Sequence, residues 1–250
     1  MRLIDRLSHT NRLARHSAFE KVFFALGMLG LAVVLPPYPG AIVVAAVVVV
    51  STLVVARIPA SAYLRVCLCP LTFLVLGIVP IVVTVAFGGR RLIDLGLSAE
   101  GVQLAIRVVL RSLAAMSCLL FLSMSTPVSH ILDVMRRLHV PAVMVELSLL
   151  VYRSIWVFSD TVYSMRVAQE ARLGYGSYRL SYRSMGLLVS SFFGRTLQRA
   201  RTMEHGLAAR NWQGEFRVLD NGTAVSGLNI ALVIVLQAAV VAVTMVWWAR

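Results

Sequence analysis

Two similar segments lie 38 positions apart in this chain: Met165-Arg-Val-Ala-Gln-Glu-Ala-Arg-Leu-Gly174 and Met203-Glu-His-Gly-Leu-Ala-Ala-Arg-Asn-Trp212. Each closes a run in which apolar residues recur every three or four positions, the spacing of one face of an α-helix. Gly174 and Asn211 follow the two Ala-Arg pairs, and both residue types tolerate the left-handed conformation that ends helices. The pattern predicts two long helices, one closing on Ala171-Arg172 and the other on Ala209-Arg210.

An arginine at the C-terminal end of a helix is favoured by the helix dipole and stays charged at any physiological pH. Its planar guanidinium can pair with a carboxylate through two hydrogen bonds, and the neighbouring alanine keeps the tip narrow. Two such tips suggest docking into two acidic grooves of a partner. The alternative is an arginine that faces solvent or lipid headgroups, and spacing alone does not decide between the two.

The composition is that of an integral membrane protein. The 250 residues are 59% hydrophobic and 14% charged, with a mean hydropathy of +0.82, which is too apolar for an ordinary soluble domain. A net charge of +13 could indicate nucleic-acid binding, but no basic patch interleaved with aromatic residues appears. Membrane orientation explains the charge better, and no nucleic-acid partner is expected.

Hydropathy predicts five spans, at 22–35, 41–56, 66–87, 102–124 and 228–248. Nineteen Lys and Arg residues fall in the segments expected inside, against three outside, so the positive-inside rule places the N-terminus in the cytoplasm. The predicted organisation is a cytoplasmic N-terminus (1–21), four transmembrane helices (22–124), a cytoplasmic region (125–217) and a final transmembrane helix (218–250). Part of the region 125–217, around 146–162, is apolar enough to enter or skim the inner leaflet. Arg107 and Arg111 are expected to reach toward the outer interface.

No metal, cofactor or catalytic site is predicted. Cys67, Cys69 and Cys118 lie in or beside apolar stretches and are expected to be buried thiols, because Cys-x-Cys does not have the usual zinc spacing. The five histidines lack the i, i+4 pairing of a metal site, and no Walker-type glycine loop appears. Two alternatives remain open: a membrane enzyme with its site at the inner leaflet, and a self-contained small transporter.

Several runs between 125 and 217 together resemble the transmembrane T subunit of energy-coupling factor (ECF) transporters, most closely its cobalt-type CbiQ branch. They are Ser125-Thr-Pro-Val-Ser, Arg137-Leu-His-Val-Pro141, Tyr152-Arg153, Ala168-Gln-Glu-Ala-Arg-Leu-Gly-Tyr175, Arg199-Ala and Ala208-Ala-Arg210. Outside this region the similarity rests on hydropathy alone. The resemblance implies an all-α membrane protein that is not an enzyme and needs no cofactor.

It also implies partners and a mechanism. T subunits of this family lie in the cell membrane between a membrane substrate-binding subunit and two cytoplasmic ABC-type ATPases. Two long crossed coupling helices each end in an Ala-Arg-Gly motif that enters an ATPase groove and transmits the ATPase motion. Ala171, Arg172, Ala209 and Arg210 match the first two motif positions, while Leu173 and Asn211 replace the glycine. Gly174 is then expected to end the first helix one residue late, and Asn211 to end the second. The cargo implied is cobalt or nickel, selected by the substrate-binding partner.

Overall fold

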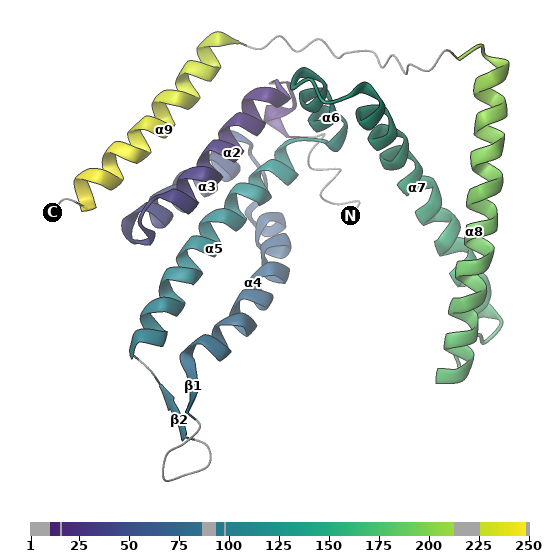
Figure 1. The fold of residues 1–250 in the computed structure, drawn as a ribbon, viewed down its shortest axis with the longest axis horizontal. Helices are drawn as coiled ribbons and strands as arrows, with labels where there is room; N and C mark the ends of the chain where they lie inside the picture. The colour runs from purple at the N-terminus through teal and green to yellow at the C-terminus, as the bar shows by residue number, and fades with distance from the viewer. Residues whose placement is uncertain (1–10, 16, 87–93, 98, 213–225, 249–250) are drawn as a thin grey trace. The chain divides into compact units, whose positions relative to one another are not determined.

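The computed structural model describes residues 11–15, 17–86, 94–97, 99–212 and 226–248, and Figure 1 shows the course of the chain. A 3₁₀ turn at Arg12–Arg15 precedes the first helix. The larger elements are α2 (Ala18–Val34), α3 (Ile42–Val50) with π-helical turns at Pro37–Ala41 and Ser51–Val55, α4 (Ala60–Val82), β1 (Val83–Ala86), β2 (Asp94–Leu97), α5 (Ala99–Ser125), α6 (Val128–Arg137), α7 (Ala142–Ala171), α8 (Tyr178–Ala209) and α9 (Gly227–Trp248). The chain is thus almost entirely helical, as its composition predicts.

Five helical stretches are long and apolar enough to cross a membrane: Pro37–Val55, Ala60–Ile78, Gly101–Ser125, Ala142–Ala171 and Gly227–Trp248. The number agrees with the prediction, but the set differs, because α7 is included and α2 is not. With 17 residues, α2 is about 26 Å long, slightly shorter than the hydrocarbon core of a bilayer. The chain is a multi-pass membrane protein.

The predicted span at 66–87 is corrected at both ends. The helix α4 begins six residues earlier, at Ala60, and gives way after Val82 to an antiparallel hairpin in which Val83 pairs with Leu97 and Ala86 with Asp94. The alternating, partly β-branched run Val83-Thr-Val-Ala suits a strand once the chain leaves the helix. The hairpin occupies part of the loop that we expected between two helices.

The chain divides into two compact units, Met1–Val134 with Asn221–Arg250, and Met135–Asp220. As labels only, we call the first the membrane unit and the second the coupling unit, after the role that the family resemblance implies. In the membrane unit, α5 packs against α2 and α3 through Phe121, Cys118 and Ala114. The rings of Phe24 and Phe121 meet edge to face at 5.1 Å. Gly27 of α2 leaves room for Gln237 of α9, the kind of close approach that small residues permit in membranes.

Two expectations for single residues change in the membrane unit. Cys67 and Cys118 are buried, but Cys69 is exposed, because residues two apart on a helix point to nearly opposite sides. The Arg111 guanidinium does more than reach outward: its Nη2 donates to the carbonyl oxygen of Leu35 at 3.3 Å. Leu35 is the C-cap of α2, so this cation lies where the helix dipole favours it.

Some predicted features lie outside the described residues. These are the first ten residues of the N-terminal segment, the loop residues 87–93 with Arg90 and Arg91, the connection 213–225 with Arg217, and Arg250 at the end of the chain.

Candidate functional site: two arginine-tipped helix ends

The candidate site is built on a helical hairpin within the coupling unit, made by α7 with 30 residues and α8 with 32. The two helices are in contact where they cross in Figure 1. Phe158 of α7 and Phe192 of α8 meet edge to face with ring centroids 5.5 Å apart. Ser177 starts α8, because its side chain accepts a hydrogen bond from the Leu180 N–H at 3.3 Å. The hairpin therefore places the end of α7 beside the beginning of α8.

The first helix end has the hydrogen bonds of a Schellman motif. Arg172 is the C-cap of α7 (φ −94°, ψ 16°), and Leu173 has the left-handed φ of 57°. The Leu173 N–H donates to the Glu170 carbonyl at 3.0 Å, and the Gly174 N–H donates to the Gln169 carbonyl at 2.9 Å. These are the two bonds that define the motif. They turn the chain sharply away and leave Arg172 at the tip.

The expectation that Gly174 takes the helix-ending conformation is therefore corrected. Leu173, the residue in the third motif position, adopts the left-handed conformation itself. Gly174 is needed for another reason: a Cβ there would lie 2.6 Å from the Ser184 Oγ and 2.9 Å from the Gln169 carbonyl oxygen. The glycine permits the turn to approach the backbone of α7 and the side chain of Ser184 on α8.

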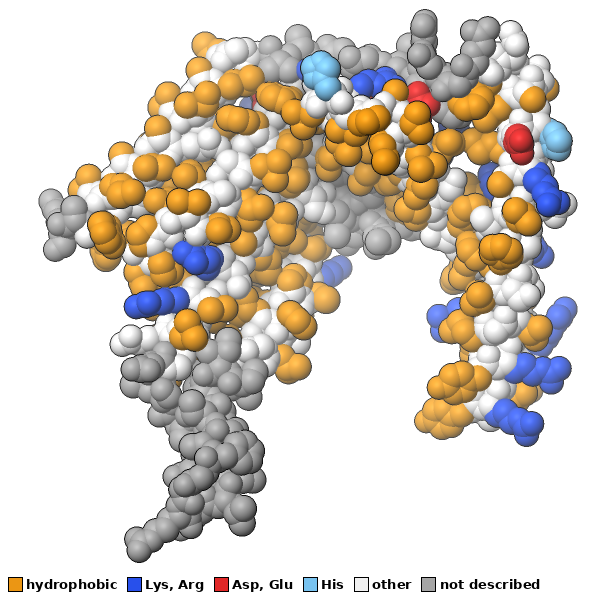
Figure 2. All heavy atoms as spheres, viewed as in Figure 1, with side chains coloured by type: hydrophobic (Ala, Val, Ile, Leu, Met, Phe, Trp, Pro, Cys, Tyr) orange, Lys and Arg blue, Asp and Glu red, His pale blue; other side chains and the backbone are white. Residues whose placement is uncertain are grey.

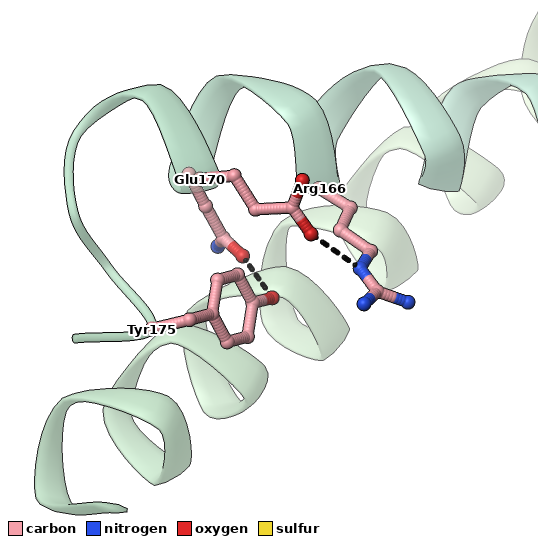
Figure 3. A network of polar contacts seen from close by, with 4 residues as sticks. Arg166, Glu170 and Tyr175 are labelled. Carbon is pink, nitrogen blue, oxygen red and sulfur yellow. Dashed lines mark hydrogen bonds and ion pairs between the residues drawn. The ribbon is translucent and has the colours of Figure 1, made fainter. Parts of the chain in front are cut away.

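Polar contacts fix this first end to α8. Ser184 Oγ donates to the Gly174 carbonyl at 2.8 Å, and Gln169 Nε2 donates to the Ser184 carbonyl at 2.9 Å. Tyr175 completes the chain of bonds, since its hydroxyl donates to Gln169 Oε1 at 2.8 Å (Figure 3). The tip at Arg172 is thus braced by side-chain bonds to the second helix.

A salt bridge extends the braced region along α7. Arg166 Nε lies 2.9 Å from Glu170 Oε1, and the Arg166 guanidinium carbon lies 5.9 Å from the centre of the Tyr175 ring (Figure 3). Sequence reasoning missed this bracing network of Arg166, Gln169, Glu170, Tyr175 and Ser184. One signal was present: the first Ala-Arg segment carries Gln-Glu before it and a tyrosine after it, and the second does not.

The second helix end repeats the backbone of the first. Arg210 is the C-cap of α8 (φ −95°, ψ 13°), and Asn211 has a φ of 53°. The Asn211 N–H donates to the Ala208 carbonyl and the Trp212 N–H to the Leu207 carbonyl, both at 3.1 Å. Asparagine enters the left-handed region more readily than most residues, so it can replace glycine here at little cost.

The turn geometry alone does not mark a site. The helix α6 ends in the same way, with His139 at a φ of 59° and the Val140 N–H bonded to the Met135 carbonyl at 3.2 Å. There the position equivalent to Arg172 and Arg210 holds Leu138. What distinguishes the ends of α7 and α8 is the Ala-Arg pair in front of the turn.

Both pairs are accessible. Ala171, Arg172, Ala209 and Arg210 are all exposed, and within the described part of the chain neither guanidinium forms a hydrogen bond or an ion pair. The first tip is bonded to α8 at Ser184 and the second closes the helix, so the stretch of α8 from Ser184 to Arg210 sets their separation, about 40 Å at the usual rise of an α-helix. The hairpin presents two unneutralised cations far apart.

The surface of α8 between the tips is basic as well as apolar. Its exposed residues include Arg179, Arg183, Arg195 and Arg199, and also Tyr182 and Phe193. Figure 2 shows Lys and Arg side chains along the lower part of this helix, with hydrophobic side chains between them. Arg153 of α7 and Arg199 of α8, both within runs that carry the family resemblance, line one groove with Thr202.

Among the described residues no group of three or more His, Cys, Asp or Glu side chains lies close enough to hold a metal ion. The arrangement at the two tips is one for binding a surface, with hydrogen-bond donors and positive charge but no paired acid and base.

Comparisons with known proteins agree on one family. The family model "CbiQ: Cobalt transport protein" matches residues 10–220. The chain is 39% identical over 239 residues to the cobalt transport protein CbiQ of Rhodobacter capsulatus, covering 96% of both chains. It is 30% identical over 223 residues to the protein of the same name from Salmonella typhimurium, covering 86% of this chain and 99% of that one. It also matches 37% of a putative fused cobalt transport protein CbiMQ of Methanocorpusculum labreanum, at 28% identity.

Proposed function

Because this chain belongs to the CbiQ family of cobalt transport proteins, we propose that it is the energy-coupling membrane subunit of an ECF-type ABC importer. It is a multi-pass membrane component of cobalt transport. In the proposed role, Ala171-Arg172 and Ala209-Arg210 enter acidic grooves on two ABC-type ATPases. The hairpin of α7 and α8 passes the ATPase motion to a membrane substrate-binding subunit, which selects cobalt or nickel.

One observation carries this proposal: the two Ala-Arg pairs lie at helix ends with the same backbone conformation and the same pair of hydrogen bonds. Two copies of one ATPase offer two identical grooves, and a single chain can fill both only by presenting the same shape twice. The separation of about 40 Å between the tips suits two separate protein partners better than one small molecule. Relatives named as transport proteins support a role other than catalysis.

The proposed membrane orientation and the proposed partners rest on the charge distribution and on the fused relative. With α2 counted as a fourth span before residue 125, as the sequence predicts, the positive-inside rule favours a cytoplasmic N-terminus in the cell inner membrane and places the basic region 125–217 on the same side, where ATPases operate. A relative whose printed name marks it as a fusion and whose chain extends well beyond the match supports a partner that works beside this chain. Lipid is the remaining partner, in contact with the exposed apolar faces of the spans.

The test replaces both tips. The double variant Arg172→Glu, Arg210→Glu should lose capture of the ATPases from solubilised membranes, because it sets negative charge against acidic grooves, while its insertion in the membrane is unchanged. The matched control is Arg195→Glu, Arg201→Glu, which makes the same change in charge on exposed residues away from both ends of α8. The docking role is wrong if the tip variant still co-purifies with the ATPases, or if the control loses them equally.

A further inference from the structure

Two neighbouring charged residues, Glu20 and Lys21, are buried in the membrane unit, with 5% and 4% of their surfaces exposed. They occupy the first turn of α2, just before the apolar run expected to enter the membrane. Charged side chains are rarely buried unless they are held by specific partners. The partners of these two lie at the ends of two other helices.

Lys21 holds the end of α5. Its Nζ donates to the carbonyl oxygens of Ser125 at 3.3 Å and Leu13 at 3.0 Å. Asn11 adds to the same point, since its Nδ2 donates to the carbonyl oxygens of Met124 and Ser125, each at 3.1 Å. Ser125 is the last residue of α5, where the helix leaves carbonyls without partners and the dipole favours a positive charge.

Glu20 holds the start of α9. Its Oε1 accepts from the Ser226 N–H at 2.9 Å, and its Oε2 accepts from the Asn229 Nδ2 at 3.0 Å. Ser226 immediately precedes α9, where free N–H groups and the dipole favour a negative charge. The charges of Glu20 and Lys21 thus match opposite ends of two helices that are more than a hundred residues apart in the chain.

These two helix ends have a particular place in the chain. After Ser125 the chain continues through α6 into the coupling unit, and Ser226 stands where it re-enters the described part of the membrane unit before α9. Lys21 therefore binds the backbone where the chain leaves the membrane unit, and Glu20 binds it just before α9, where the described chain resumes in that unit. Burial lowers the pKa of Lys21 to about 8, opposed by the charge of Glu20, so the amine remains largely protonated at neutral pH.

We propose that Glu20 and Lys21 form a clamp that fixes the end of α5 at Ser125 and the start of α9 at Ser226 to α2, as positioning residues for energy coupling. This inference rests on the proposed coupling function. Motion of the coupling unit can act on α5 and α9 together only if the two helix ends at Ser125 and Ser226 are held to one another. The clamp makes α2 the common anchor of both, so that motion is passed to the membrane helices rather than lost at the joints.

The test uses the complete transporter, with its ATPases and substrate-binding subunit, in proteoliposomes. The variants Lys21→Met and Glu20→Gln should still capture the ATPases, which distinguishes this inference from the docking role of Arg172 and Arg210. Cobalt uptake per ATP hydrolysed should fall on the order of tenfold, within the usual range of coupling between sites. The conservative variants Lys21→Arg and Glu20→Asp should recover part of it.

The charge exchange Glu20→Lys, Lys21→Glu is the decisive control. It keeps composition and net charge but places each charge at the wrong helix end, so uptake per ATP should be no better than in the single variants. If this exchange restored coupling, the two charges would be acting only on each other and not on the helix ends, which would contradict the clamp. Unchanged uptake per ATP in the single variants would overturn the clamp, even if less transporter assembles.

A second measurement needs no variant. Lys21 is the single lysine of the chain, so acetylation followed by mass spectrometry reports on its amine alone beside the N-terminal amine. Because burial is what lowers the pKa of Lys21, an amine that became exposed would react at the rate of an ordinary lysine, and a buried one would be shielded from the reagent. The clamp predicts slow labelling both at rest and during ATP turnover. Labelling of Lys21 as fast as that of an exposed amine in either condition contradicts it.

Discussion

At the scale of single residues, Leu173 stands where the family motif has glycine, and this difference affects the first tip most. A leucine with a φ of 57° carries the clash between Cβ and its own carbonyl that glycine avoids, on the order of 1 to 2 kcal/mol. The side chain is 77% exposed, so packing offsets little of this penalty. The first tip keeps its shape because the bracing network holds it.

Leu173→Gly should therefore stabilise the first helix end by about 1 kcal/mol. Hydrogen exchange of the amides of Leu173 and Gly174, whose bonds close the end of α7, should slow about fivefold. Leu173→Ala is the matched control, since it removes the side chain but keeps a Cβ in the left-handed region. Equal slowing in the alanine variant would show that the side chain, not the backbone conformation, sets the stability.

Lys21 gives a prediction for the dependence of stability on pH. Its pKa is about 8 in the folded protein, lowered mainly by burial from 10.5. Between these values the unfolded chain binds a proton that the folded chain has released, so raising the pH through this window favours folding. The gain is at most about 1.4 kcal/mol per pH unit.

The measurement compares thermal unfolding of the detergent-solubilised wild type and Lys21→Met between pH 7 and pH 10. The wild type should gain stability relative to the variant as the pH rises above 8. A difference that stays flat across the window would show that Lys21 is not held in a buried site.

At the scale of elements, the turn between α7 and α8 is a tight joint whose geometry depends on Gly174. Its carbonyl accepts from Ser184, and a Cβ in its place would meet Ser184 and the backbone of Gln169. Two glycines lie close together here, and only one of them is crowded: a Cβ on Gly176 would meet nothing closer than the Leu173 carbonyl at 3.4 Å.

Gly174→Ala should loosen the joint and cost about 1 to 3 kcal/mol, as overpacking usually does, whereas Gly176→Ala should have little effect. Hydrogen exchange across residues 166–184 should rise in the first variant alone, and ATPase capture should weaken while the second tip still binds. Similar behaviour of the two variants would mean that the close approach at Gly174 contributes nothing to the joint.

The sequence predicted features that depend on neighbouring residues, but not contacts between residues far apart in the chain. Helical periodicity and cap residues are local signals, and they predicted the C-terminal ends of α7 and α8, where both Ala-Arg pairs lie, and the bounds of α9. The Gln169 to Ser184 bond joins residues 15 apart, and the Glu20 to Ser226 bond joins residues 206 apart. Such pairings depend on how helices meet, which periodicity does not record. Leu173 was missed because propensity favours Gly174, and tertiary contacts overrode it.

At the scale of the whole molecule, a single unbroken helix separates the two tips. The joint fixes Arg172 to the first turns of α8, and Arg210 ends the same helix. Changes in the angle between α7 and α8 therefore leave the distance between the tips nearly unchanged.

Spin labels at Leu173→Cys and Asn211→Cys, in a chain whose three native cysteines are replaced by serine, should show one distance of about 40 Å, given the length of α8 beyond Ser184. The distance should be the same in the nucleotide-free and ATP-bound transporter. A second pair at Val143→Cys and Asn211→Cys, which spans the two helices, serves as the comparison because it can change when they move. A tip distance that shortens with ATP would contradict a rigid α8.

Because the distance between the two arginine tips is fixed by α8, the coupling unit would act as a rigid rod between its two proposed partners. If, as proposed, two ATPases hold the tips and approach each other on binding ATP, the coupling unit could not shorten and would have to rotate, with each arginine tip turning in its groove. The small side chain of the alanine beside each arginine leaves room for such a rotation. In the proposed complex, ATP binding would then apply torque to the membrane unit rather than compression.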